Sequence, residues 1–342
     1  MIENRPQTPR RISVVITVKN DPAGIALALE SLGVQTRMPD EIVIVDGGSI
    51  DGTMQTIRDC KTKLPMLRVI EAPGANIAAG RNRGVREAIG EIIATTDSGC
   101  RADPQWLARL IQPFEDDPAT EFVAGFYRVI GVTPLERVIG LSTMRGQLDD
   151  LRPESFNPSA RSMALTKDLW ERAGGWPQWV NYSEDTLFDQ HVRRLGAKWV
   201  LAPDAVVDWR PRGSLRALAR QFYFYGTGRG QTGIDAAGYR YNIRNLSLVA
   251  ASIPLWPLHG GTIALTAALL LYFGWWAHHA HAQRVAGREG TRGAYGRCVV
   301  VMNVVTVAGA LGYIAGWWRQ RHRGGQTKLA PGGQFALTEQ PA

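Results

Sequence analysis

Two hydrophobic patterns alternate over the first 116 residues of the chain. Short, almost wholly apolar runs are typical of strands buried on both faces of a sheet, and they occur at residues 12–18, 42–45 and 67–70. Longer segments of mixed polarity have the length of helices, and they occur at residues 23–32, 75–89 and 104–116. The alternation predicts an α/β protein with a parallel sheet and helices on both of its faces.

Two strand-like runs end in an aspartate that is followed by small residues. Asp46 lies in IVIVDGGSIDGT and Asp97 lies in EIIATTDSGC. Open α/β sheets bind ligands in the crevice at the carboxyl ends of their strands. One carboxylate is therefore expected to contact a nucleoside, and the other is expected to hold a divalent cation together with substrate phosphates. A turn that serves only the structure is the alternative.

A later segment places two adjacent acids at the expected start of a helix. Ser183 could cap this helix, Glu184 and Asp185 would lie in its first turn, and Gly196 would end it. Because the helix dipole favours acids in a first turn, the pattern alone leaves a purely structural explanation open.

Five motifs follow one another within residues 11–229: VVITVKND, IVDGGSIDGT, GANIAAGRNRG, TTDSG and YSEDTLFDQHVRRLG. In these motifs the chain resembles the family-2 glycosyltransferases, inverting enzymes of GT-A fold that use sugar nucleotides. The resemblance implies a mixed, mostly parallel nucleotide-sugar-binding sheet flanked by helices. It also implies transfer of a sugar, with inversion, from a UDP-linked donor to a hydroxyl of a saccharide acceptor.

The resemblance implies roles for six donor-binding residues: Thr17, Asn20 and Asp46 around the nucleoside, and Asn76, Arg81 and Ser98 near the rest of the nucleotide. The residues themselves favour Arg81, because a guanidinium suits a diphosphate and Arg81 follows Gly80 directly. Arg83 and Arg86 are expected to be solvated.

The resemblance also implies the metal site and the catalytic base. Asp97 would bind Mg²⁺ or Mn²⁺, although Gly99 stands where the metal motif has a second acid. Asp185 would accept the proton of the attacking hydroxyl, with Glu184 on the acceptor side.

The acceptor is expected to contact aromatic and basic side chains. Trp176 and Trp179 could form a platform for a sugar ring, or they could belong to the core. Residues 210–229 are rich in arginine and aromatics and resemble a segment of the succinoglycan-type glucosyltransferases. They are expected to lie on the membrane surface and to bind lipid head groups or a polyprenyl-diphosphate-linked acceptor. The residues of this segment expected to contact the acceptor are Arg220, Tyr223 and Arg229. A solvated amphipathic helix is the alternative.

Two long apolar stretches, residues 246–276 and 298–318, both end in tryptophan pairs. Aromatic pairs are common at bilayer interfaces, so two spanning or membrane-embedded helices are expected. Pro254 and Pro257 interrupt the first stretch, which could instead be a buried, re-entrant or interfacial segment. Arginines flank both stretches, so the positive-inside rule does not choose a topology.

The expected organisation has five parts: an N-terminal tail (1–10), a catalytic domain (11–209), a basic-aromatic segment (210–245), a membrane region (246–318) and a disordered basic tail (319–342). The catalytic domain is expected to face the cytoplasm at the cytoplasmic membrane. The net charge is +8, but no nucleic-acid partner is expected. The three cysteines have no CxxC spacing, which favours a reduced protein without structural zinc. A sugar-phosphate nucleotidyltransferase and a non-catalytic membrane scaffold are the rival functions.

Overall fold

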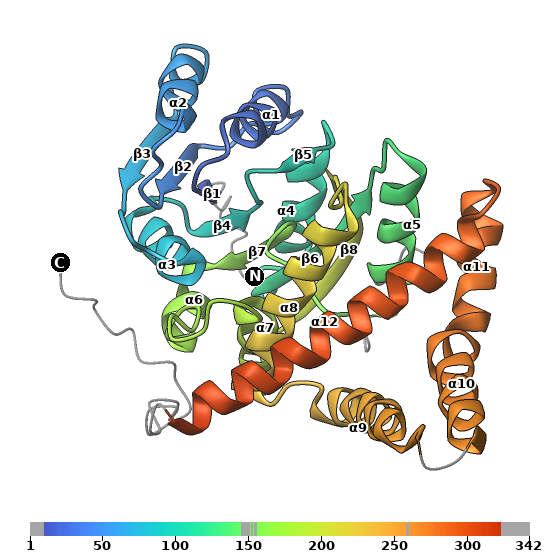
Figure 1. Cartoon of the computed structure of the whole chain (residues 1–342). Coiled ribbons are helices and arrows are strands. Elements are labelled where there is room, and N and C mark those ends of the chain that lie inside the picture. The colour runs from blue at the N-terminus through green and yellow to red at the C-terminus, as the bar shows by residue number, and fades with distance from the viewer. Residues whose placement is uncertain (1–9, 145–150, 152, 154–155, 258–259, 323–342) are drawn as a thin grey trace. The chain divides into compact units, whose positions relative to one another are not determined.

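The computed structural model describes residues 10–144, 151, 153, 156–257 and 260–322. The expected tails therefore lie outside the described residues, apart from residue 10 and residues 319–322. The chain forms two compact units (Figure 1). The first comprises residues up to 128 together with 152–209, and the second takes residues 129–151 and the chain from Arg210 through the last described helix.

The first unit is built on an eight-stranded sheet with the strand order β3-β2-β1-β4-β7-β6-β8-β5. The strands are β1 (Ile12–Val18), β2 (Glu41–Asp46), β3 (Leu67–Glu71), β4 (Ile92–Thr95), β5 (Cys100–Ala102), β6 (Phe122–Val129), β7 (Met163–Thr166) and β8 (Trp199–Trp209). The first four pair in parallel, whereas β7 is antiparallel to β4, β6 to β7 and β5 to β8. The sheet is therefore mixed rather than wholly parallel, as expected for a GT-A sheet.

The helices of the first unit are α1 (Pro22–Leu32), α2 (Thr53–Lys61), α3 (Ile77–Glu87), α4 (Trp106–Asp116), α6 (Lys167–Ala173) and α7 (Glu184–Arg194). Three of them begin at side-chain caps, which satisfy backbone N–H groups that have no partner within the helix. Asp21 accepts a hydrogen bond from the amide of Gly24 at 3.0 Å, Asn76 accepts one from Ala79 at 2.9 Å, and Thr166 accepts one from Leu169 at 3.2 Å. The three helices expected in this region are confirmed, with small shifts at their ends.

Helix α3 packs closely on β1 and β2 because it presents glycines to the sheet. A Cβ atom at Gly84 would lie 2.6 Å from Cγ1 of Val15, and one at Gly80 would lie 3.0 Å from Cγ2 of Thr17. Real Cβ contacts are longer, so these positions require glycine. The close packing sets Arg81 beside the carboxyl ends of the strands.

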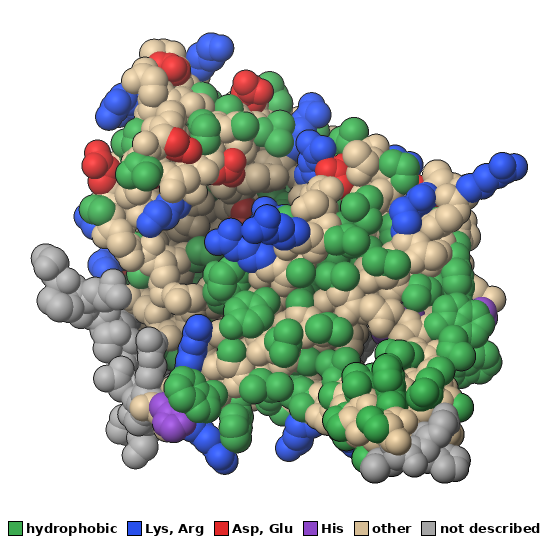
Figure 2. Space-filling model, in the orientation of Figure 1, with side chains coloured by type: hydrophobic (Ala, Val, Ile, Leu, Met, Phe, Trp, Pro, Cys, Tyr) green, Lys and Arg blue, Asp and Glu red, His purple; other side chains and the backbone are tan. Residues whose placement is uncertain are grey.

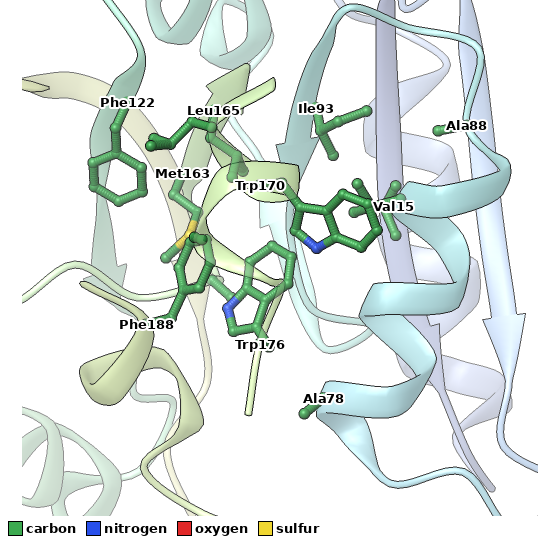
Figure 3. Close-up of a cluster of buried hydrophobic side chains, with 14 of the residues drawn as sticks. Val15, Ala78, Ala88, Ile93, Phe122, Met163, Leu165, Trp170, Trp176 and Phe188 are labelled. Carbon is green, nitrogen blue, oxygen red and sulfur yellow. The ribbon is translucent and has the colours of Figure 1, made fainter. Parts of the chain in front are cut away.

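A hydrophobic core joins α3 and the sheet to α6 and α7 (Figure 3). Trp176 stacks on Phe188 with their ring centroids 4.5 Å apart. Buried Asn82 of α3 accepts hydrogen bonds from the indole N–H of Trp170 and the amide of Trp176, and it donates to the carbonyl of Trp176. Asn82 therefore fixes the turn before the segment that carries the two acids.

The second unit is helical in the part that the structure describes. Its elements are α5 (Pro134–Thr143), α8 (Leu215–Thr232), α9 (Ala236–Ser252), η2 (Ile253–Leu255), α10 (Gly260–Gly274), η3 (Trp276–His278), α11 (His279–Glu289) and α12 (Ala294–His322). Side chains of α5, α8, α11 and α12 form one apolar cluster, among them Val138, Leu218, Val285 and Val301.

Helices α8 and α12 run side by side in parallel, in contact through glycines. A Cβ atom at Gly226 or Gly230 of α8 would lie about 2 Å from a carbonyl oxygen of α12, and one at Gly312 or Gly316 of α12 would lie equally close to a carbonyl oxygen of α8. Only small residues let two helix backbones approach this closely. One face of α8 is therefore covered by α12 over residues 223–230, whereas Arg216 and Arg220 are exposed.

The first apolar stretch does not form one long helix. Residues 246–276 are divided between the end of α9, η2 and α10, and α10 has 15 residues. Among the described residues, only α12 is long and apolar enough to cross a membrane. The structure thus offers one candidate span where the sequence predicted two, because the prolines break the first stretch. Figure 2 shows many apolar side chains exposed over α10 and α12, including Leu271, Leu311, Trp317 and Trp318.

Candidate active site

A buried arginine brings three carboxylates together at the carboxyl ends of the strands. The guanidinium of Arg81 lies 3.1 Å from Oδ1 of Asp97, 3.1 Å from Oε1 of Glu184 and 2.7 Å from Oδ1 of Asp185. The Arg81 side chain is only 4% exposed. Burial alone would lower the pKa of Arg81, but the three carboxylates outweigh it and raise that pKa.

The three acids come from two elements that are far apart in sequence. Asp97 follows β4, and Glu184 and Asp185 form the first turn of α7. Burial, followed by the charge of Asp185, raises the pKa of Glu184 to about 7, and Arg81 offsets this only in part. Glu184 is thus partly protonated near neutral pH.

Asp185 is both oriented and accessible. Its Oδ1 contacts Arg81, its Oδ2 accepts a hydrogen bond from the amide of Ala160 at 3.1 Å, and its side chain is 22% exposed. A carboxylate held at both oxygens and open on one side can accept a proton from a bound hydroxyl.

The expected cap of α7 is wrong, although the helix begins where predicted. Ser183 has a φ of 71°, in the left-handed region, and its side chain makes no capping hydrogen bond. Serine caps a helix from extended backbone, so the turn before Glu184 has the wrong conformation. Asp185 therefore takes its position from Arg81 and Ala160.

The residues expected around the nucleoside gather at the ends of β1 and β2. Asp46 is buried and accepts hydrogen bonds from the amides of Gly48 and Ser49 at 3.0 and 2.9 Å. Asn20 has a φ of 53° and accepts one from Ile50 at 2.9 Å. Thr17, opposite Val45 in the parallel register, lies beneath Gly80 of α3. These contacts fix the loop after β2, and nucleoside binding stays a prediction.

Asn76 and Ser98 both have hydrogen-bond partners within the protein. Asn76 caps α3 and donates to the carbonyl of Gln178 and to Oδ1 of Asn181 at 2.7 and 3.0 Å. Ser98 donates to Oδ2 of Asp21 at 2.9 Å. Asp21, which caps α1, thus connects the first helix to the strand end that carries Asp97.

Trp176 belongs to the core. It is 1% exposed and stacks on Phe188, so its ring offers no face to a sugar. The acceptor role expected for Trp176 is therefore corrected to the core alternative. Trp179 is 40% exposed and remains available as a platform.

The remaining acceptor candidates lie in α8 of the second unit. Arg220 is exposed with its guanidinium 5.7 Å from the ring centroid of Phe224. Arg229 forms an ion pair with Asp235, and the backbone of Tyr223 contacts Gly312. Their contact with an acceptor stays a prediction.

Sequence reasoning missed Arg161, which lies near Asp97. Its Nε is 3.7 Å from Oδ2 of Asp97, and its guanidinium lies over the rings of Tyr127 and Trp209. No signal in the sequence marks this residue, because its neighbours come from β6, β8 and the end of β4.

The donor set suits a metal ion that is completed by substrate phosphates. The described residues hold no group of three or more His, Cys, Asp or Glu side chains arranged for a metal. Asp97 is nevertheless 34% exposed, and a Cβ atom at Gly99 would meet nothing within 4 Å. Mg²⁺ commonly takes one or two carboxylates plus phosphates and water, so Asp97 and the open space beside it fit such an ion.

Comparison with solved structures agrees with this architecture. The mannosyltransferase PcManGT from Pyrobaculum calidifontis, solved in complex with GDP-Man and Mn²⁺, matches with a TM-score of 0.59 at 20% identity, over 90% of this chain and 88% of that one. The mixed sheet and this likeness define the GT-A fold.

Sequence comparisons give the family. Residues 13–171 match the model of glycosyl transferase family 2. The chain is 27% identical to glycosyltransferase AglE of Haloferax volcanii over 64% of its length and 72% of that protein's. It is 23% identical to succinoglycan biosynthesis protein ExoA of Rhizobium meliloti over 90% of its length and 94% of that protein's. Residues 13–171 therefore form a glycosyl transferase family 2 domain.

Proposed function

We propose that this enzyme transfers a hexose, with inversion, from a nucleotide sugar to a hydroxyl of a saccharide acceptor carried by a membrane lipid. The product would serve polysaccharide or glycolipid synthesis. One observation carries the proposal: the guanidinium of Arg81 joins Asp97, the metal candidate, to Asp185, the base candidate. In this proposal, the leaving-group and proton-accepting functions belong to one network.

In the proposed reaction, Asp185 accepts the proton of the acceptor hydroxyl. The new bond forms between that oxygen and the anomeric carbon as the bond from this carbon to the donor phosphate breaks. A single displacement inverts the carbon, and the nucleoside diphosphate leaves. Arg81 holds Asp185 at Oδ1 and Ala160 holds it at Oδ2, so the base is oriented before the acceptor arrives.

The departing diphosphate needs positive charge close to it. A Mg²⁺ or Mn²⁺ ion at Asp97 would supply that charge when bound. Arg81 adds a fixed cation beside the same carboxylate. A UDP-linked donor follows from the family resemblance, and a GDP-linked donor is the other candidate, because the mannosyltransferase from Pyrobaculum calidifontis was solved with GDP-Man.

The second unit would hold the enzyme on a membrane surface. Helix α8 lies along α12 and carries exposed Arg216 and Arg220. If α12 crossed the bilayer, α8 would enter it too, and each arginine near the centre would cost about 2.5–3.5 kcal/mol or more. We therefore place the pair in the interface, with lipid against Leu311 and Trp318 and the catalytic unit in the cytoplasm.

A labelling experiment tests this placement. Single cysteines replace Arg292 or Arg319, at the two ends of α12, in a chain whose native cysteines are changed to serine. With an impermeant maleimide, both positions should react only in inside-out vesicles. Reaction from opposite sides would mean that α12 spans the membrane.

A donor screen tests the proposed activity. Membranes containing the full-length enzyme are incubated with UDP- and GDP-sugars and extracted lipid acceptor, and Asp185→Asn is the control. Release of nucleoside diphosphate with an inverted product linkage is expected. Release of pyrophosphate from a nucleoside triphosphate and a sugar phosphate would indicate a nucleotidyltransferase, and turnover of no donor would indicate a scaffold.

A further inference from the structure

We infer that Arg161 binds the diphosphate of the donor. The inference rests on the proposed function and adds a residue that neither the sequence motifs nor the family resemblance assigned. Arg161 precedes β7 and lies in the catalytic unit with Asp97 and Asp185.

The guanidinium of Arg161 lies against two aromatic rings. Its central carbon lies 5.1 Å from the ring centroid of Tyr127 and 4.7 Å from that of Trp209. Two cation–π contacts restrict the orientation of a planar guanidinium. Its nitrogens meet polar groups: Nη1 donates to Oγ of Ser159 at 3.1 Å, and Nε lies 3.7 Å from Oδ2 of Asp97.

The backbone around Arg161 is held on both sides. The amide of Ala160 donates to Oδ2 of Asp185. On the other side, buried Ser162 donates to the carbonyl of Ala205 at 2.9 Å and accepts from the indole of Trp106 at 2.9 Å. Arg161 thus lies on a fixed segment between the metal carboxylate and the base, where a donor diphosphate is expected.

The loose contact between Arg161 and Asp97 leaves this arginine able to take an anion. Asp97 has a guanidinium near each oxygen, Arg81 at 3.1 Å and Arg161 at 3.7 Å. The Arg161 contact is the longer one, so it is the contact that a phosphate can replace with a shorter charge-assisted hydrogen bond. Because Gly99 supplies no carboxylate, Asp97 would be the one motif carboxylate to hold a cation, and a second arginine would share in neutralising the leaving group.

A purely structural Arg161 would only neutralise Asp97, and binding measurements separate the two roles. The affinities of full-length wild type and Arg161→Gln for uridine diphosphate, guanosine diphosphate and the two nucleosides are measured by calorimetry with Mg²⁺. We expect the diphosphate that the wild type prefers to bind about tenfold to a hundredfold more weakly to the variant, as for loss of a charged hydrogen bond. Nucleoside affinity should change little.

Two further variants test whether misfolding explains a loss of affinity. Arg161→Lys keeps the charge but loses the flat stacking, so it should recover part of the diphosphate affinity. Arg128→Gln removes an exposed arginine of the same unit that pairs with Asp208 at 2.8 Å, and it should bind like the wild type. Thermal unfolding curves establish that each variant is folded.

The outcomes distinguish this inference from the proposed function. Equal diphosphate affinities for wild type and folded Arg161→Gln would overturn the role of Arg161 and leave the proposed function intact. An equal loss for nucleoside and diphosphate would also overturn it, because the defect would not concern phosphate. A wild type that binds no nucleoside diphosphate would refute the proposed function, and the inference with it.

Discussion

Nη1 of Arg81 lies 2.7 Å from Oδ1 of Asp185, and this pair joins α3 to the first turn of α7 across 104 positions of sequence. The contact gives Asp185 an oriented carboxylate while one side of it stays exposed. The pair therefore separates two effects that mutation can test: loss of the base and loss of the charge that holds it.

Asp185→Asn should reduce transfer by at least about a hundredfold, because it removes the proton acceptor and keeps the shape. Donor affinity should change only a few-fold. Steady-state rates and donor calorimetry measure the two effects, with Asp168→Asn, an exposed aspartate on α6, as the control. Loss of donor binding as well as activity would mean that Asp185 supports the nucleotide or the fold.

Arg81→Met should destabilise the catalytic unit by about 3–5 kcal/mol, because it leaves acids near one another without their buried cation. Urea unfolding at pH 7.5 measures the loss. Adding Glu184→Gln to this variant removes one of the three charges and should restore part of the stability. Equal stabilities of the single and double variants would show that the acids do not repel one another there.

Glu184 should make stability depend on pH. Its pKa is raised above the ordinary value of 4.5 to about 7, so the folded state holds this proton more tightly than the unfolded state does. The contribution is full below pH 4.5, falls as the pH rises to about 7, and is constant above that. Unfolding free energies of wild type and Glu184→Gln should diverge over this window, whereas exposed Glu171→Gln should parallel the wild type. Parallel curves for Glu184→Gln would contradict the shift.

Asp97→Ala should abolish the metal dependence of donor binding, since Gly99 offers no carboxylate in its place. Calorimetry with the donor, with Mg²⁺, with Mn²⁺ and after chelation, gives the comparison. The wild type should bind more tightly with the metal, and the variant should bind equally weakly in all conditions. Indifference of the wild type to added metal would remove the metal from the mechanism.

Gly312→Ala and Gly296→Ala make the same change at two positions of α12, with opposite results expected. A Cβ atom at Gly312 would lie 1.9 Å from the carbonyl oxygen of Tyr223, whereas one at Gly296 would meet nothing within 4 Å. The first should destabilise by about 1–3 kcal/mol through overpacking, and the second should stabilise slightly, because alanine favours helix. Thermal unfolding in detergent measures both. Similar effects would mean that α8 and α12 are not in contact.

The sequence predicted the site residues whose positions depend only on their neighbours in the chain. Asp46 and Asp97 were found because a strand followed by an aspartate and small residues places the side chain at the edge of the sheet, which the structure confirms. Trp176 stayed ambiguous because a tryptophan beside a turn suits both a core and a sugar platform. Its burial depends on Phe188, which comes from another element.

Contacts between distant segments could not be read from the sequence. Arg161 looks like an ordinary loop arginine until β6 and β8 bring Tyr127 and Trp209 against it. Similarly, the reason for the glycines of α8 is visible only with α12 beside them. The sequence therefore predicted where Asp46 and Asp97 lie, but it did not predict the partners of Arg161.

The position of α5 limits how this enzyme could be rearranged by recombination or by design. Its chain segment lies between the two stretches that build the catalytic unit, yet Val138 and Ile139 pack in the core of the other unit, and Arg137 pairs there with Glu289 at 3.0 Å. A chain that ends near Ala237 would keep α5 without α11, and α8 without α12. Truncation at a single position therefore does not separate the catalytic unit from the other one. An exchange of the second unit between relatives would have to carry residues 129–151 along with the C-terminal helices.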